Sequence, residues 1–163
     1  MKQIKHELSY PGATVDDVVA MISDPAFRER VADHQGVVRK KVSVDGEVPA
    51  KTISVELVHG TDRVPSFARK FVGDEIPIVQ VEKWSTDTAA SVEVTIPGKP
   101  GEMVGEARIE QRGDAVVETY DLAVKVKIPL VGGKIEDLIA GLLVKAFKAE
   151  NKVGIKWLEG DRG

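Results

Sequence analysis

Residues 134–158, KIEDLIAGLLVKAFKAENKVGIKWL, place apolar side chains at the three- and four-residue intervals of an amphipathic helix. These apolar positions are Ile135, Leu138, Ile139, Leu142, Ala146, Phe147, Val153 and Trp157. A helix of this length spans more than about 30 Å, enough to cross a whole sheet. The pair Gly132-Gly133 precedes the segment, and we interpret it as a backbone bend into one long C-terminal helix.

Upstream of this helix, apolar and polar residues alternate with the period of two that is typical of strands. The expected strands are residues 2–10, 37–44, 53–59, 76–85, 89–96, 103–111 and 115–128, with turns at Asp45-Gly46, Thr86-Asp87, 97–101 and 112–114. Connections this short join antiparallel neighbours, because parallel strands need a crossover of a dozen or more residues. The middle of the chain is therefore predicted to be an antiparallel meander.

Two helix-start signals follow the first strand. Thr14 with Asp17 three residues later is a weak capping box, and Asp24-Pro25 combines a capping residue with a proline at the first helical position. Two short helices are expected here. Residues 62–73 interrupt the alternation, and we expect either a helical turn or a packed loop there.

Length and composition indicate one ordinary domain over residues 1–163. The chain has 42% hydrophobic and 30% charged residues, the balance of a protein with a single core. We predict an α+β fold in which a curved antiparallel sheet of about seven strands grips the long C-terminal helix across its concave face, with two short helices after the first strand.

Charge and residue usage exclude several functions. A net charge of -3 offers no basic field for a nucleic acid, and no apolar window is long enough to span a membrane. Cysteine is absent, which suits a cytoplasmic protein and removes thiolate metal sites. The three histidines lack metal-binding spacing, and neither a P-loop nor a dinucleotide motif occurs, so we expect no metal and no cofactor.

The order of these elements resembles the helix-grip fold of the START-like superfamily, which includes lipid-transfer domains and polyketide cyclase/dehydrase-like proteins. Three segments are similar to an uncharacterised bacterial family within it: Leu57 to Gly73, Val79 to Trp84, and Ile128 to Glu136. The resemblance covers nearly the whole chain. It implies a cavity between sheet and helix that holds apolar molecules such as lipids, sterols or polyketides.

The expected cavity would be lined by apolar strand faces and by the long helix. The candidate ligand-binding residues are His6, Ile53, Val55, Leu57, His59, Val92, Val94, Tyr120, Leu122, Val124, Leu138 and Leu142. Gly105 and Ala107 put small side chains at the centre of one strand face, which we interpret as leaving volume for the helix or a ligand.

Candidate acid or base groups are few. His6 and His59 fall on apolar strand faces, where a neutral imidazole could transfer protons, although a core histidine is the simpler interpretation. Alternation leaves the direction of Gln80, Glu82, Trp84 and Glu118 open. We favour a solvated surface position for Gln80 and Glu82; a carboxylate pointing inward from either strand would line the cavity with a raised pKa.

Three functions fit this sequence. The leading hypothesis is a non-catalytic protein that binds or carries a small apolar molecule, without stable membrane anchoring. The second is a cyclase- or dehydratase-type enzyme that uses His6, His59 or an inward glutamate. The third is a protein-interaction module with a filled core. The sequence does not identify the ligand or the oligomeric state.

Overall fold

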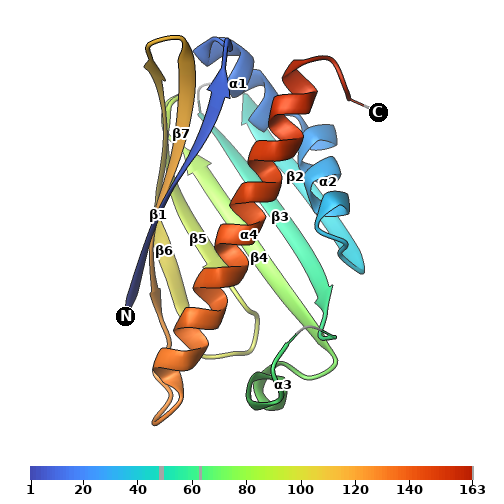
Figure 1. The fold of residues 1–163 in the computed structure, drawn as a ribbon, viewed down its shortest axis with the longest axis vertical. Coiled ribbons are helices and arrows are strands. Elements are labelled where there is room, and N and C mark those ends of the chain that lie inside the picture. Colours follow the sequence, from blue (N-terminus) through green and yellow to red (C-terminus); the bar gives the residue numbers. More distant parts are fainter. Residues whose placement is uncertain (48–49, 63, 163) are drawn as a thin grey trace.

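A curved sheet and one long helix form the two layers of the molecule (Figure 1). The computed structural model describes residues 1–47, 50–62 and 64–162. The elements in chain order are β1 (Lys2–Pro11), α1 (Val15–Ile22), α2 (Pro25–His34), β2 (Arg39–Glu47), β3 (Ala50–Gly60), α3 (Ser66–Val72), β4 (Glu75–Trp84), β5 (Ala89–Thr95), β6 (Glu102–Arg112), β7 (Ala115–Lys125) and α4 (Gly132–Leu158). This architecture confirms the predicted fold.

The strands of the described residues form one antiparallel sheet in the order β1-β7-β6-β5-β4-β3-β2. Each strand from β2 to β6 is hydrogen-bonded to the next strand along the chain, which confirms the predicted meander. The first strand instead returns to the last one, with Lys2 opposite Val124 and Pro11 opposite Ala115. This pairing places β1 beside the chain segment that leads into α4.

The two short helices begin where the capping signals predicted. In α1, the Thr14 side chain accepts a hydrogen bond from the Asp17 amide at 3.1 Å, and the Asp17 carboxylate accepts from the Thr14 amide at 3.1 Å. In α2, the Asp24 carboxylate accepts from the Ala26 amide at 2.9 Å. Both caps satisfy backbone donors that the first turn of a helix leaves unpaired.

The hairpin of β2 and β3 is longer than expected. We predicted its turn at Asp45-Gly46, but these residues lie within the paired strands, opposite Thr52 and Lys51. Gly46 has a φ of 86°, and a Cβ there would lie 2.7 Å from the carbonyl oxygen of Ala50. Glycine is needed for this close approach inside the strand pair. The Asp45-Gly46 dipeptide, which is typical of turns, therefore marks a backbone contact within the hairpin instead of its end.

Gly105 of β6 also reflects a close backbone approach, which corrects our interpretation of it as a source of empty volume. A Cβ at this position would lie 1.9 Å from the carbonyl oxygen of Asp121 on β7. The neighbouring strand therefore already occupies the space that the missing side chain leaves.

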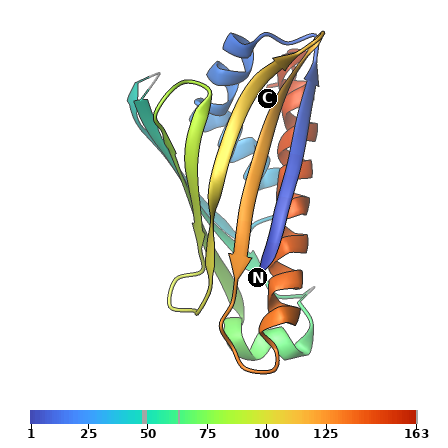
Figure 2. The ribbon, with the colours of Figure 1, turned by 90° about the vertical axis from the view of Figure 1, so that its left-hand side faces the viewer.

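Helix α4 has two halves with different surroundings. Towards the C-terminus it packs tightly: the Phe147 ring stacks on Tyr120 with centroids 4.2 Å apart, and the Trp157 ring meets Phe27 edge-on at 5.5 Å. Towards the N-terminus, Leu138 and Leu142 are only half-buried. Figure 2 shows α4 running along β1 while the β2 side of the sheet curves away from it.

Two glycines of α4 allow a matched test of this packing. A Cβ on Gly154 would lie 2.6 Å from Cε1 of Tyr10 and 3.1 Å from Cε of Met21, whereas a Cβ on Gly141 meets nothing within 4 Å. Overpacking a core costs about 1–3 kcal/mol, and replacing a helical glycine by alanine gains up to about 1 kcal/mol.

We therefore expect Gly154→Ala to lower the free energy of unfolding by about 1–2 kcal/mol and Gly141→Ala to raise it by up to about 1 kcal/mol. Urea unfolding followed by circular dichroism measures both. Equal stabilisation of the two variants would show that the C-terminal half of α4 is not in tight contact with β1.

Candidate functional site

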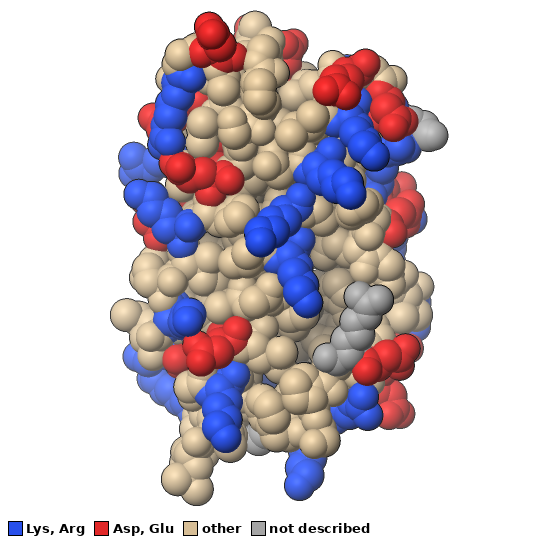
Figure 3. All heavy atoms as spheres, in the orientation of Figure 1, with Lys and Arg blue, Asp and Glu red and all other residues tan. Residues whose placement is uncertain are grey.

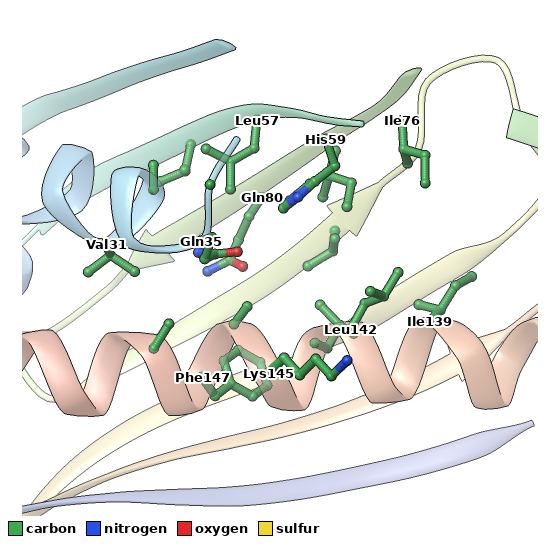
Figure 4. Close-up of a pocket in the computed structure, with 18 of the residues that line it drawn as sticks. Val31, Gln35, Leu57, His59, Ile76, Gln80, Ile139, Leu142, Lys145 and Phe147 are labelled. Atoms are coloured by element: carbon green, nitrogen blue, oxygen red, sulfur yellow. The ribbon is translucent and has the colours of Figure 1, made fainter. Parts of the chain in front are cut away.

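A cavity of about 760 Å³ lies between α4, α2 and the concave face of the sheet. Its walls come from α2, from β3 to β6, from the segment around α3, and from α4. In Figure 4, Leu57, His59 and Gln80 of the sheet lie across the cavity from Leu142, Lys145 and Phe147 of α4. This volume is typical of a small-molecule site.

Half of the predicted ligand-binding residues line this cavity. They are Val55, Leu57, His59, Val94, Leu138 and Leu142. Ile53, Val92, Tyr120, Leu122 and Val124 are instead buried in the core, at 2% exposure or less. His6 is half-buried on β1, where its ring stacks on Phe147 with centroids 6.0 Å apart. Periodicity identified the inner face of the sheet but not which part of it the C-terminal half of α4 covers.

Several lining residues were not found from the sequence. The α2 wall contributes Arg28, Val31 and Gln35, and the α4 wall contributes Lys145 and Glu150. Nothing in the local pattern of α2 shows that it closes one side of the cavity, because that depends on how the strand–helix–helix connector folds back onto the sheet. The apolar run of β4, which includes Ile76 and Ile78, was a usable signal that we did not apply to the site.

A buried arginine forms the polar end of the cavity. Arg28 is 4% exposed, and each of its three side-chain nitrogens donates a hydrogen bond. Nε donates to the Ile22 carbonyl at 2.8 Å, Nη2 to Oε1 of Glu82 at 2.8 Å, and Nη1 to Oε2 of Glu82 at 3.0 Å and to Oε1 of Glu150 at 3.1 Å. One guanidinium thus joins α2 to β4 and to α4.

Glu82 receives three further hydrogen bonds from its neighbours. Nε2 of Gln80 donates to it at 2.7 Å, Nε1 of Trp84 at 3.1 Å and the Tyr120 hydroxyl at 3.3 Å. Our preference for a surface position of Gln80 and Glu82 was therefore wrong, since Glu82 is fully buried and Gln80 lines the cavity. The inward direction is possible because Arg28, distant in sequence, neutralises the carboxylate.

Glu118 of β7, whose direction the sequence left open, is also fully buried. Burial, and next the neighbouring Glu150 carboxylate, raise the pKa of Glu118 well above its ordinary value. Neither Glu118 oxygen has a hydrogen-bond partner among the described residues. A carboxyl group buried without a donor is favoured in its neutral form, in line with the raised pKa.

Lys51 of β3 lies opposite Trp84 of β4 in the sheet. Its ammonium group is 5.0 Å from the centre of the Trp84 ring, and the residue is 3% exposed. Burial and then the charge of Arg28 lower the pKa of Lys51. The Lys51 ammonium group has no hydrogen-bond partner among the described residues, and of the residues bonded around Arg28 and Glu82, those that line the cavity are Arg28, Gln80 and Glu150.

Of the two candidate histidines, His59 lies apart from the buried carboxyl groups, whereas His6 pairs with Tyr120, two residues along β7 from Glu118. His59 stands six residues along β3 from Ile53, which is opposite Glu82, a separation of about 20 Å along an extended strand. Burial lowers the pKa of His59, and burial followed by the charge of Lys148 lowers that of His6. The charge of Glu7 acts in the opposite direction on His6, but burial outweighs it, so both imidazoles favour the neutral form.

The described residues contain no helix with the length and hydropathy of a membrane span. They also contain no group of three histidine or acidic side chains arranged to hold a metal ion.

Family comparison agrees with this fold. The family model described as "Protein of unknown function (DUF2505)" matches residues 5–158. The chain belongs to this family. No curated protein matches it.

Solved structures with the same fold share little sequence with this DUF2505 chain. A protein of Thermus thermophilus matches with a TM-score of 0.66 at 14% identity, covering 97% of each chain. Truncated norcoclaurine synthase of Thalictrum flavum matches at 0.58 and 19%, over 93% of this chain and 92% of that one. A STAR-related lipid transfer protein of Xanthomonas axonopodis matches at 0.54 and 18%, over 96% and 85%. The chain has the helix-grip fold of the START-like superfamily, as its sequence indicated.

Replacing a buried glutamate by glutamine should affect stability differently at Glu82 and at Glu118. Glu118→Gln replaces a buried carboxyl group that has no hydrogen-bond donor by a neutral amide of the same shape, whereas Glu82→Gln leaves Arg28 without its bidentate carboxylate. Breaking a buried ion pair costs about 3–5 kcal/mol. We expect Glu82→Gln to lose that much stability at pH 7 and Glu118→Gln to lose none.

The raised pKa of Glu118 predicts how the stability of the protein changes with pH. Its pKa in the folded protein is above the unfolded value of about 4.3, so the stability of the native protein falls as pH rises beyond that value. Urea unfolding at pH 5.5, 7 and 8.5 should show a flatter profile for Glu118→Gln than for the native protein. Equal losses for both variants would show that Glu118 is ionised and paired.

Proposed function

We propose that this protein binds a small, mainly apolar molecule in the cavity between α4 and the sheet. The observation that carries the proposal is the cavity itself, about 760 Å³ in volume and walled by Leu57, Ile78, Leu138 and Leu142 among other apolar side chains. Burying apolar surface contributes about 25 cal/mol per Å² before ordering costs, so such a wall favours an apolar occupant. The STAR-related lipid transfer protein with this fold supports the same function.

The polar end of the cavity gives the bound molecule an orientation. Gln80 and Glu150 reach the cavity surface there, and both are held by hydrogen bonds to their neighbours, Gln80 to Glu82 and Glu150 to Arg28. A few fixed polar groups in an apolar site are the usual source of ligand specificity. A hydroxyl or carbonyl group on the ligand would find its partners at this end.

Catalysis of the cyclase or dehydratase type has less support. An acid–base enzyme needs a titratable group within hydrogen-bonding reach of its substrate. Glu82 is already bonded to Arg28, Gln80, Trp84 and Tyr120, and His59 is far from it along β3. A filled interaction module fits less well still, because the space between α4 and the sheet is hollow.

A neutral fluorescent probe, N-phenyl-1-naphthylamine, tests binding directly. Leu142 and Val144 are both half-buried on α4, but of the two only Leu142 lines the cavity. We expect Leu142→Asn to weaken probe binding at least about tenfold, because replacing a buried leucine by a polar side chain loses about 1.5–3 kcal/mol of apolar contact. Val144→Asn should bind the probe as the native protein does.

Thermal unfolding of both variants controls for loss of structure, since each replaces a half-buried apolar residue of the same helix. Binding that is absent from the native protein, or that is weakened equally by the two substitutions, would contradict the proposed function.

A further inference from the structure

The rim of the cavity carries a row of lysines. Lys145, Lys148 and Lys152 are exposed on α4 and line the opening. Their three- and seven-residue spacing puts them on one side of the helix. Figure 3 shows Lys and Arg side chains gathered along the middle of the face that carries α4. None of the three forms an ion pair within the part of the chain that the structure describes.

Little negative charge opposes these lysines at the rim. Among the described lining residues, the acidic side chains are Asp62, next to α3, and Glu150, which is buried and held by Arg28. The opening is therefore net positive, in a chain whose overall charge is negative. Such a local field attracts an anion and repels a cation.

The polar end of the cavity, in contrast, disfavours an anion. Glu82, Glu118 and Glu150 gather there, and every side-chain nitrogen of Arg28 already donates to Glu82, Glu150 or a backbone carbonyl. A carboxylate or phosphate at this end would lie among three carboxyl groups and beside a guanidinium whose charge is already paired with Glu82 and Glu150, and burying such an uncompensated charge is costly. A neutral end of the ligand is tolerated there and an anionic end is not.

We infer that the molecule bound in this cavity is an amphipathic anion. Its apolar body lies against the sheet with a neutral end towards Gln80, and its anionic group lies at the rim beside Lys145, Lys148 and Lys152. This inference rests on the proposed function and adds the charge and the direction of the ligand.

Three probes of equal chain length separate charge from apolar binding: decanoate, 1-decanol and decyltrimethylammonium. Each competes with N-phenyl-1-naphthylamine at pH 7.5, where decanoate is ionised, and below its micelle concentration. Exposed charge pairs are individually weak, so three lysines are expected to favour decanoate over decanol by about tenfold in 20 mM salt. The preference should shrink at 500 mM salt, because screening acts on exposed charges.

The triple variant Lys145→Gln, Lys148→Gln, Lys152→Gln should bind decanoate about tenfold more weakly while its affinity for decanol changes less than threefold. The matched control is Lys83→Gln, Lys134→Gln, Lys156→Gln, which removes the same charge from exposed positions that do not line the cavity. This control should keep the full preference for decanoate.

Equal affinity of the native protein for decanoate and decanol would overturn the inference while leaving the proposed function in place. Tightest binding of decyltrimethylammonium, or an unchanged preference in the rim variant, would also overturn it. Failure of all three probes to displace N-phenyl-1-naphthylamine would contradict the proposed function itself, and the inference with it.

Discussion

The ion pair between Arg28 and Glu82 is the interaction on which this structure depends. It brings α2 against β4, and the second bond of the same guanidinium, to Glu150, fixes α4 above them. A fully buried carboxylate is stable only when its charge is compensated, so α2 must remain where it closes one side of the sheet. The cavity lies between elements that this pair holds in place.

The division of α4 follows from the same constraint. Around Glu150 the helix is tied to Arg28 at the polar end of the cavity, and through Phe147 and Gly154 it packs on Tyr120 and Tyr10. Towards its N-terminus, the half-buried Leu138 and Leu142 line the cavity. A single helix thus covers the core and also forms one wall of the cavity. The hydrogen bonds among Arg28, Glu82 and Glu150 lie between these two regions.

The fold could be predicted from the sequence because local signals agreed with it: helical spacing after Gly133, alternation in the strands, and caps at Thr14 and Asp24. The cavity could be predicted only in part. Leu57 and Leu142 were correctly placed on inner faces, but Tyr120 and Leu122 share the same periodicity and are core.

Whether a strand side chain points inward or outward was hardest to predict for charged residues. Glu82 and Glu118 sit on strand faces whose pattern permits either side, and the decision is made by Arg28 and Glu150, which are distant in sequence. Neither partner has a distinctive local motif. The predictions of a turn at Gly46 and of empty volume at Gly105 were wrong for a related reason. Each glycine accommodates a backbone contact with a neighbouring strand, and only the register of the sheet reveals that contact.

Methyl-resolved NMR of isoleucine, leucine and valine side chains during titration with 1-decanol tests the central claim most directly. If an apolar molecule occupies the cavity, the methyl signals of Leu57, Ile78 and Leu142 should shift together and saturate with one ligand per chain, while those of the exposed Leu130 and Val104 remain in place. Shifts confined to exposed methyl groups, or no shifts at all, would contradict the account.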